Sequence, residues 1–227
     1  MNKKYLIWDV PNISISWSEW FEMEFGVTIL DPLEMTRKIL LWKGWGNCGS
    51  WSTLVVFPGC GATLVKFYIE TLNADWTSQW LWKAHPFAKR FWNPGQNPVA
   101  LVGRVSRGVI VGIKDVVVID DVISSGETIR KCRKENLMFI PGARWHALSW
   151  VGQKAAITKG FVGTFSSVVV GEIGTKVPIN SLSTLIEKKD IAGSYAKRNL
   201  GNQEKAFLEL LEDFRKGKWD RIDIYCV

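Results

Sequence analysis

Apolar and polar positions alternate between strand-like and helix-like patterns through the middle of the chain. Short apolar runs predict strands at Trp51–Phe57, Val116–Ile119, Trp145–Val151 and Val168–Val170. Apolar residues at helical spacing predict helices at Ala62–Leu72, Glu127–Leu137 and about Gln203–Arg215. The second strand is an unbroken β-branched run, which is typical of a central parallel strand covered on both faces.

Strands that alternate with helices predict an α/β fold, a doubly wound parallel sheet. A further helix should begin at Asp31-Pro32-Leu33-Glu34, where Asp can cap and Pro suits the first helical position. Open sheets of this kind bind ligands at the carboxyl ends of their strands, so chemistry is expected after Phe57 and after Ile119. Residues 1–49 and 176–227 are less regular and are interpreted as cover for one end of a single domain whose core spans about 50–175.

Composition favours a soluble intracellular protein. Hydrophobic residues make up 47% and charged residues 22% of the 227 residues, an ordinary globular balance. No apolar run is long enough for a transmembrane helix, and the N-terminus reaches Asp9 before a signal-peptide core could form. We therefore expect a cytoplasmic location and no membrane contact. The four cysteines are scattered, and with only two histidines in the chain they argue against a zinc site; we expect reduced thiols.

The distribution of charge indicates an anionic ligand. The net charge is +7, and the span 76–114 contains no Asp or Glu. The basic residues of that span are Lys83, Lys89, Arg90, Arg104, Arg107 and Lys114. A nucleic acid, a membrane surface or a phosphorylated small molecule would each be attracted by this positive charge.

The segment 116–128, Val-Val-Val-Ile-Asp-Asp-Val-Ile-Ser-Ser-Gly-Glu-Thr, carries the most specific signal. A buried strand leads through two acids into a short turn that opens a helix. Backbone N–H groups of Ser125, Gly126, Glu127 and Thr128, with the hydroxyls of Ser124, Ser125 and Thr128, would form an anion site at the helix N-terminus. Gly126 can adopt a backbone angle that other residues resist. Asp120 and Asp121 suit the hydroxyls of a diol joined to the bound phosphate.

This segment resembles, at every position, the 5-phosphoribosyl-1-pyrophosphate (PRPP) motif of type I phosphoribosyltransferases. The resemblance implies that Asp120 and Asp121 bind the ribose and that residues 124–128 bind its 5-phosphate. It also implies Mg²⁺ as cofactor, held mainly by PRPP near the two acids without a direct protein ligand. It further implies a hood built from the terminal segments, and a homodimer. A P-loop is absent from the sequence, and Gly59–Leu64 lacks the third glycine of a dinucleotide fingerprint.

Two further features agree with the family. The resemblance assigns the pyrophosphate loop to Pro58, Gly59, Cys60 and Gly61, which end the strand upstream. A mobile basic loop usually closes over the site, and the acid-free span 76–114 lies in its position. The candidate catalytic residues in this span are Lys83, His85, Lys89 and Arg90. They resemble the basic loop of orotate phosphoribosyltransferases but differ in spacing, so which basic residue acts in catalysis stays open.

The predicted function is transfer of the phosphoribosyl group from PRPP to a nucleobase with release of pyrophosphate, a purine being favoured over orotate. Catalysis would rest on positioning and electrostatics, and no Ser-His-Asp or Cys-His constellation is evident in the sequence. The alternative is a PRPP-sensing regulatory protein of the same fold that binds nucleic acid without catalysis. Most of the thirteen tryptophans are interpreted as packing residues.

Overall fold

A computed structural model describes residues 4–10, 17–85, 112–137, 140–161, 163–174 and 179–217. The chain divides into two compact units, which we describe separately. The larger unit spans residues 33–173, and the smaller unit combines residues 1–32 with 174–227. Residues 33–49, which the sequence pattern assigned to the hood, therefore group with the central sheet.

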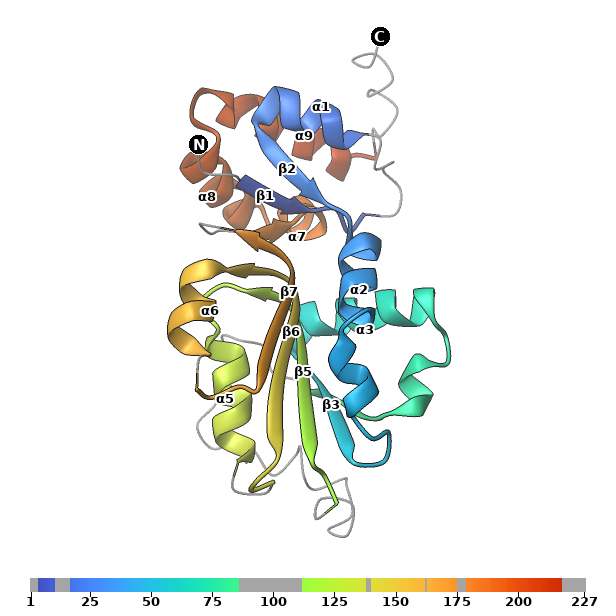
Figure 1. Cartoon of the computed structure of the whole chain (residues 1–227). Helices are drawn as coiled ribbons and strands as arrows, with labels where there is room; N and C mark the ends of the chain where they lie inside the picture. The colour runs from blue at the N-terminus through green and yellow to red at the C-terminus, as the bar shows by residue number, and fades with distance from the viewer. Residues whose placement is uncertain are drawn as a thin grey trace, which may run out of the picture. The chain divides into compact units, whose positions relative to one another are not determined.

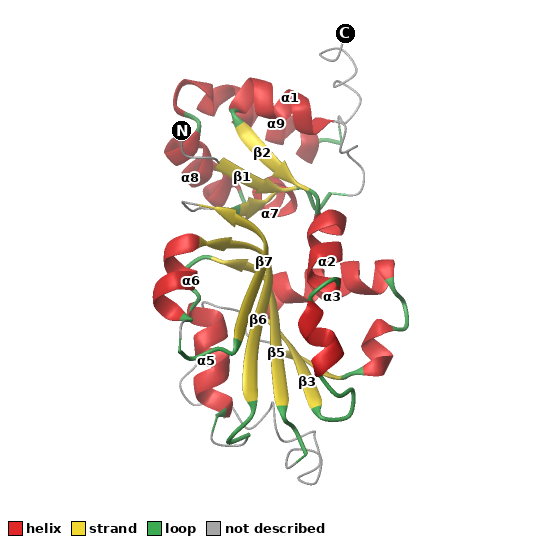
Figure 2. Ribbon diagram, in the orientation of Figure 1, coloured by secondary structure: helices red, strands yellow, loops and turns green. Residues whose placement is uncertain are grey.

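The larger unit is built on a five-stranded sheet in the order β4-β3-β5-β6-β7. Figure 2 labels β3, β5, β6 and β7 of this sheet. The strands are β3 (Thr53–Pro58), β4 (Leu81–His85), β5 (Asp115–Ile123), β6 (Arg144–Gln153) and β7 (Ser167–Gly174). β3 pairs in parallel with β4 and with β5, and β5 pairs in parallel with β6. The predicted parallel α/β sheet is confirmed.

Helices cover both faces of this sheet (Figure 1). The helices are α2 (Pro32–Leu40), α3 (Gly59–Leu72), α5 (Glu127–Asn136) and α6 (Lys154–Gly160). On one face, Ile129 and Cys132 of α5 pack in one core with Val116 and Val118. On the other, Trp150 of β6 donates to Thr36 of α2 at 2.8 Å and contacts the ring of Tyr68 in α3. The doubly wound arrangement is therefore confirmed, and it leaves the carboxyl ends of β3 and β5 side by side.

The prediction of a mobile loop across residues 76–114 is wrong for its first ten residues. Trp76–Gln79 forms a 3-10 helix, η3, and Leu81–His85 forms β4, an edge strand in register with β3 from Leu54↔Leu81 to Pro58↔His85. The unpaired side of β3 accounts for the difference, because a buried strand needs hydrogen-bond partners on both sides. Residues 86–111, with Lys89 and Arg90, lie outside the described residues.

The smaller unit is more regular than the sequence pattern indicated. Its sheet, β2-β1-β8, joins β1 (Lys4–Ile7) in parallel to β2 (Val27–Leu30) and β8 (Asn180–Ser181). Its helices are α1 (Ser18–Phe25), α7 (Leu182–Glu187), α8 (Lys189–Asn199) and α9 (Glu204–Arg215), with the 3-10 turn η5 (Gly201–Gln203) before α9. Trp8, Phe21, Phe25 and Phe207 share an aromatic core. The strands are two to four residues long, too short to show a period in the sequence.

The helix predicted near Gln203–Arg215 is confirmed as α9, with Phe207, Leu211 and Phe214 buried. Trp8 and Trp17 are buried in the core of the same unit, in agreement with their interpretation as packing residues. None of the described helices is long and apolar enough to cross a bilayer.

Candidate functional site

The junction between β5 and α5 has the strand-turn-helix form that the motif predicted. β5 ends at Ile123, and α5 begins at Glu127. Between them, Gly126 has φ +72° and ψ 8°, in the left-handed region, and its C=O accepts the N–H of Arg130 at 3.0 Å. The N–H of Glu127 donates to Ser125 Oγ at 3.3 Å. The first-turn amides of a helix form a favourable environment for an anion.

Gly126 is also required by packing, which the sequence did not show. A Cβ at this position would overlap the ring of Phe161, which is 1% exposed and packs on Phe165 with ring centroids 4.9 Å apart. The sequence interpretation gave Gly126 a role in the backbone conformation of the turn. The structure adds a buried aromatic ring directly behind the turn.

The two acids of the motif occupy different environments. Successive residues of a strand face opposite sides of the sheet. Asp120 is 1% exposed, and its carboxylate accepts the N–H of Asp121 at 3.1 Å. The half-buried Asp121 directs its carboxyl group at Gly61 in the first turn of α3, where a Cβ would overlap it. Asp121 is therefore the acid that faces the junction of β3 and α3.

One oxygen of Asp121 lacks a partner in the described part of the chain. Oδ1 is buried and has no hydrogen-bond partner among the residues that the structure describes. Leaving a buried acceptor unpaired costs about 1–3 kcal/mol. The positive end of the α3 dipole offsets part of that cost. A ligand hydroxyl or a divalent cation at this atom would remove the cost of the unpaired acceptor. The observed geometry therefore fits both a ribose and a Mg²⁺ ion bound to PRPP.

The segment predicted as a pyrophosphate loop is continuous secondary structure. β3 ends at Pro58, and α3 begins at Gly59 rather than at Ala62. The N–H groups of this first turn have no acceptor within the helix, and the turn contains no acid. β3 and β5 are parallel neighbours, so α3 and α5 both begin at the carboxyl end of the sheet.

The basic candidates are resolved in part. Lys83 and His85 lie in β4, in register with Val56 and Pro58, at the carboxyl end of the sheet where the other candidate residues gather. The structure describes only their backbone. Lys89 and Arg90 are outside the described residues, so the assignment of a catalytic basic residue stays a prediction.

Gly61→Ala should lower the free energy of unfolding by about 1–2 kcal/mol, because the new methyl group overlaps the Asp121 carboxyl group. In an Asp121→Ala background the same change should be neutral or slightly stabilising, since alanine favours a helix over glycine. Urea unfolding of the two single variants and the double variant measures the coupling. Additive effects would show that the two residues do not touch.

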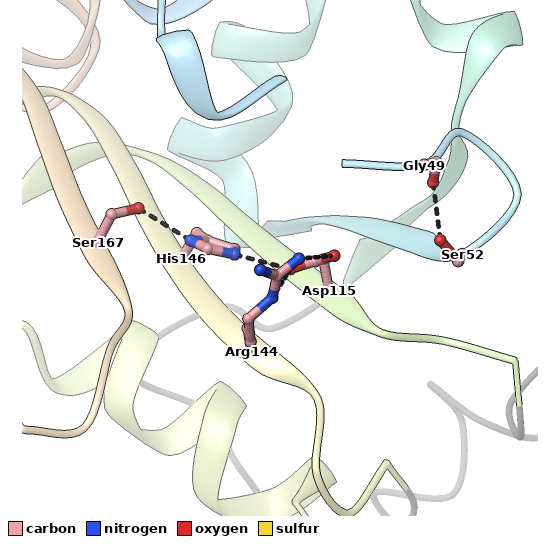
Figure 3. Close-up of polar contacts among 6 residues, drawn as sticks. All are labelled: Gly49, Ser52, Asp115, Arg144, His146 and Ser167. Carbon is pink, nitrogen blue, oxygen red and sulfur yellow. Dashed lines mark hydrogen bonds and ion pairs between the residues drawn. The ribbon is translucent and has the colours of Figure 1, made fainter. Parts of the chain in front are cut away.

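A second polar cluster lies at the opposite, amino end of β5 (Figure 3). His146 contacts Asp115 Oδ1 through Nε2 at 3.0 Å and Ser167 Oγ through Nδ1 at 2.9 Å. Cys48 offers its sulfur to the same group. The sequence interpretation that no Ser-His-Asp or Cys-His constellation exists is wrong. These residues are far apart in the chain, and only the strand register brings them together. Cys48 and Cys132 are free thiols, as expected.

Comparisons with known proteins add little to this geometry. No family model and no curated protein matches the chain. Among solved structures, it is similar to Helicobacter pylori xanthine-guanine-hypoxanthine phosphoribosyltransferase, with 13% sequence identity and a TM-score of 0.37 over 79% of this chain and 92% of that chain. A similarity of this degree carries no argument about the reaction, so the functional assignment rests on the residues themselves.

Proposed function

We propose that this protein is a phosphoribosyltransferase that transfers the 5-phosphoribosyl group of PRPP to a nucleobase and releases pyrophosphate. The observation that carries the proposal is the full motif at 116–128, set on a strand-turn-helix with Gly126 in the left-handed conformation. An Asp121 oxygen without a partner among the described residues, beside a second helix N-terminus, supports it. PRPP carries a 5-phosphate and a pyrophosphate at C1, so its ribose hydroxyls need an acceptor between two anion sites.

The roles of the residues follow from their positions. The amides and hydroxyls of residues 124–128 would bind the 5-phosphate, and the first turn of α3, with Pro58–Gly61, would bind the pyrophosphate. Asp121 would accept a ribose hydroxyl, while Asp120 orients it through the Asp121 N–H. When bound with the donor, Mg²⁺ would neutralise charge on the pyrophosphate. Fixed donors at the N-terminus of α3 would stabilise the negative charge that develops on the leaving pyrophosphate.

The test is to incubate the full chain with PRPP and Mg²⁺ and with guanine, hypoxanthine, adenine or orotate separately. We expect pyrophosphate release that depends on a base, with the matching nucleotide as product. A purine is favoured because the lysine loop of orotate enzymes is not reproduced at Lys83 and His85. No turnover with any base, together with PRPP binding and a salt-sensitive shift of labelled DNA or RNA, would instead indicate the regulatory alternative.

Ser125→Asp should weaken PRPP binding by about tenfold or more, roughly 1.4 kcal/mol, because it places a negative charge within the phosphate turn. Ser125 is exposed, and an acid near a helix N-terminus does not destabilise the helix, so the fold should be retained. Calorimetric titration of PRPP measures the effect. Ser194→Asp, at an exposed position of α8 in the smaller unit, is the matched control. Equal affinities for the two variants would place the phosphate elsewhere.

A further inference from the structure

Three side chains with different ligand atoms meet at the amino end of β5 in the larger unit. Cys48 Sγ, a carboxylate oxygen of Asp115 and a ring nitrogen of His146 all lie within 4.8 Å of one another. Asp115 is 1% and His146 8% exposed, and Cys48 is half-buried. Ligand atoms around a tetrahedral zinc ion lie roughly 3.3–3.8 Å apart, given bonds of about 2.0–2.3 Å. Small side-chain shifts would bring these three atoms to that spacing.

The backbone holds the cluster together from both sides. The 3-10 helix η2 (Lys43–Asn47) precedes Cys48, whose N–H donates to the C=O of Trp45 at 3.2 Å. In the turn that follows, Ser52 donates to the C=O of Gly49 through its N–H at 3.0 Å and its Oγ at 3.3 Å (Figure 3). The C=O of Ser52 in turn accepts the N–H of Asp115 at 3.2 Å. Sites held on such ordered backbone keep the geometry that a metal requires.

Outer contacts orient the Asp115 carboxylate. Arg144 forms a two-point ion pair with it, Nε to Oδ1 at 2.8 Å and Nη2 to Oδ2 at 2.9 Å. Burial alone would raise the pKa of Asp115, but the hydrogen bonds and charges of Arg144 and His146 lower it below its ordinary value. The two-point ion pair therefore fixes the carboxylate, and Oδ2 retains a second lone pair beyond its contact with Arg144.

The contacts of His146 allow a cation to enter. Its Nε2 and Asp115 Oδ1 now share one proton across 3.0 Å. If a metal ion took the place of that proton, the ring would carry its hydrogen on Nδ1 and donate to Ser167 Oγ, which can either donate or accept. Such a partner on the second nitrogen is the usual support of a metal-bound histidine. The Trp42 ring, with its centroid 5.0 Å from that of the imidazole, forms an apolar wall.

From this geometry we propose that Cys48, Asp115 and His146 bind a divalent metal ion of the zinc class, with a fourth position left for water. A thiolate, an imidazole and a carboxylate together suit Zn²⁺, whereas Mg²⁺ prefers oxygen ligands alone. The site is separate from the proposed PRPP site, since Asp115 and Asp121 are six positions apart on one strand, about 20 Å. Burial and the charge of Asp115 raise the pKa of Cys48, so the thiol must release its proton when the ion binds.

The experiment uses Co²⁺ as a spectroscopic substitute for zinc, titrated into the reduced, metal-stripped full chain. We expect one equivalent to bind, with a near-ultraviolet thiolate-to-cobalt charge-transfer band and visible bands of tetrahedral cobalt, both abolished by added Zn²⁺. Cys48→Ser should lose the charge-transfer band. Cys132→Ser and His85→Gln, which remove another thiol and the only other histidine, should leave both signals unchanged.

Ser167→Ala separates metal binding from a structural role of the cluster, because it retains all three ligands. It should bind Co²⁺ about 10–100-fold more weakly while keeping the charge-transfer band. Circular dichroism and thermal unfolding confirm that each variant is folded, and Zn²⁺ should raise the melting temperature of the wild type but not that of Cys48→Ser. A wild-type protein without the thiolate band, or a band that survives Cys48→Ser, would overturn the proposal.

Discussion

Gly126→Ala should lower the free energy of unfolding by about 2–5 kcal/mol, an unusually large effect for the replacement of one glycine. The left-handed conformation at φ +72° costs a non-glycine residue about 1–2 kcal/mol. Overlap of the new Cβ with the buried Phe161 ring adds about 1–3 kcal/mol, because the ring cannot move without disturbing its contact with Phe165. Denaturant unfolding followed by circular dichroism measures the change.

Gly142 provides the matched control. Its φ is +82°, but a Cβ there would have no atom of the described residues within 4 Å, so Gly142→Ala should lose only the conformational part, about 1–2 kcal/mol. The difference between the two variants isolates the contact with Phe161. In a Phe161→Ala background, Gly126→Ala should cost no more than Gly142→Ala does. Equal losses for Gly126→Ala and Gly142→Ala in the wild type would show that Phe161 does not occupy the space behind the turn.

This double constraint on Gly126 affects how the motif can be tested. A β-branched residue at this position would stand against a phosphate bound in the turn. Because the side chain would meet Phe161 first, loss of binding in such a variant would not distinguish a blocked site from a disturbed fold. Exposed Ser125 and partly buried Asp121 are the better positions, since neither side chain supports the core.

The sequence predicted most elements of the larger unit because their patterns are local. Four β-branched or aliphatic residues at Val116–Ile119 indicate a buried parallel strand whatever surrounds them. Asp31 and Pro32 predict the start of α2 by their conformational preferences alone. The acids, the turn residues and the helix start of the motif are adjacent in the chain, so the strand-turn-helix at 116–128 could be predicted before any contact was known.

What could not be predicted depends on register between distant segments. Asp115 pairs with Arg144 across β5 and β6, and His146 follows two positions later on the same face. One signal for this cluster was available in the sequence, a charged residue at the first position of a buried strand. Nothing in the sequence, however, determines which residue of β6 lies opposite it. The contact of Asp121 with Gly61 depends likewise on the pairing of β3 with β5. Nothing in the sequence distinguishes Phe161 from the other aromatic residues. Its contact with Gly126 depends on the position of α6, which it directly follows.

Asp121→Asn should weaken PRPP binding or lower turnover by about 1–3 kcal/mol, roughly 5- to 150-fold, the scale of a lost hydrogen bond to a charged group. The variant should unfold at the same or a slightly higher denaturant concentration than the wild type. Asp121 Oδ1 is buried without a hydrogen-bond partner in the described part of the chain, so removal of its charge sacrifices no observed contact. A loss of PRPP binding without a loss of stability is expected for a carboxylate that contacts the ligand but makes no hydrogen bond through this oxygen in the free protein.

The measurement pairs calorimetric titration of PRPP and Mg²⁺ with urea unfolding of the same preparation. Asp190→Asn, at an exposed position in α8, removes an equal charge from the smaller unit and should change PRPP affinity only through the general effect of net charge. It controls for the general effect of net charge on the binding of an anion, which would make any Asp→Asn variant bind PRPP more tightly. The two effects oppose each other at Asp121, because loss of a carboxylate near phosphates lowers repulsion while loss of a ribose acceptor lowers affinity. Weaker binding in the folded variant would therefore mean that the carboxylate contacts the donor, whereas unchanged or tighter binding would remove Asp121 from the proposed site.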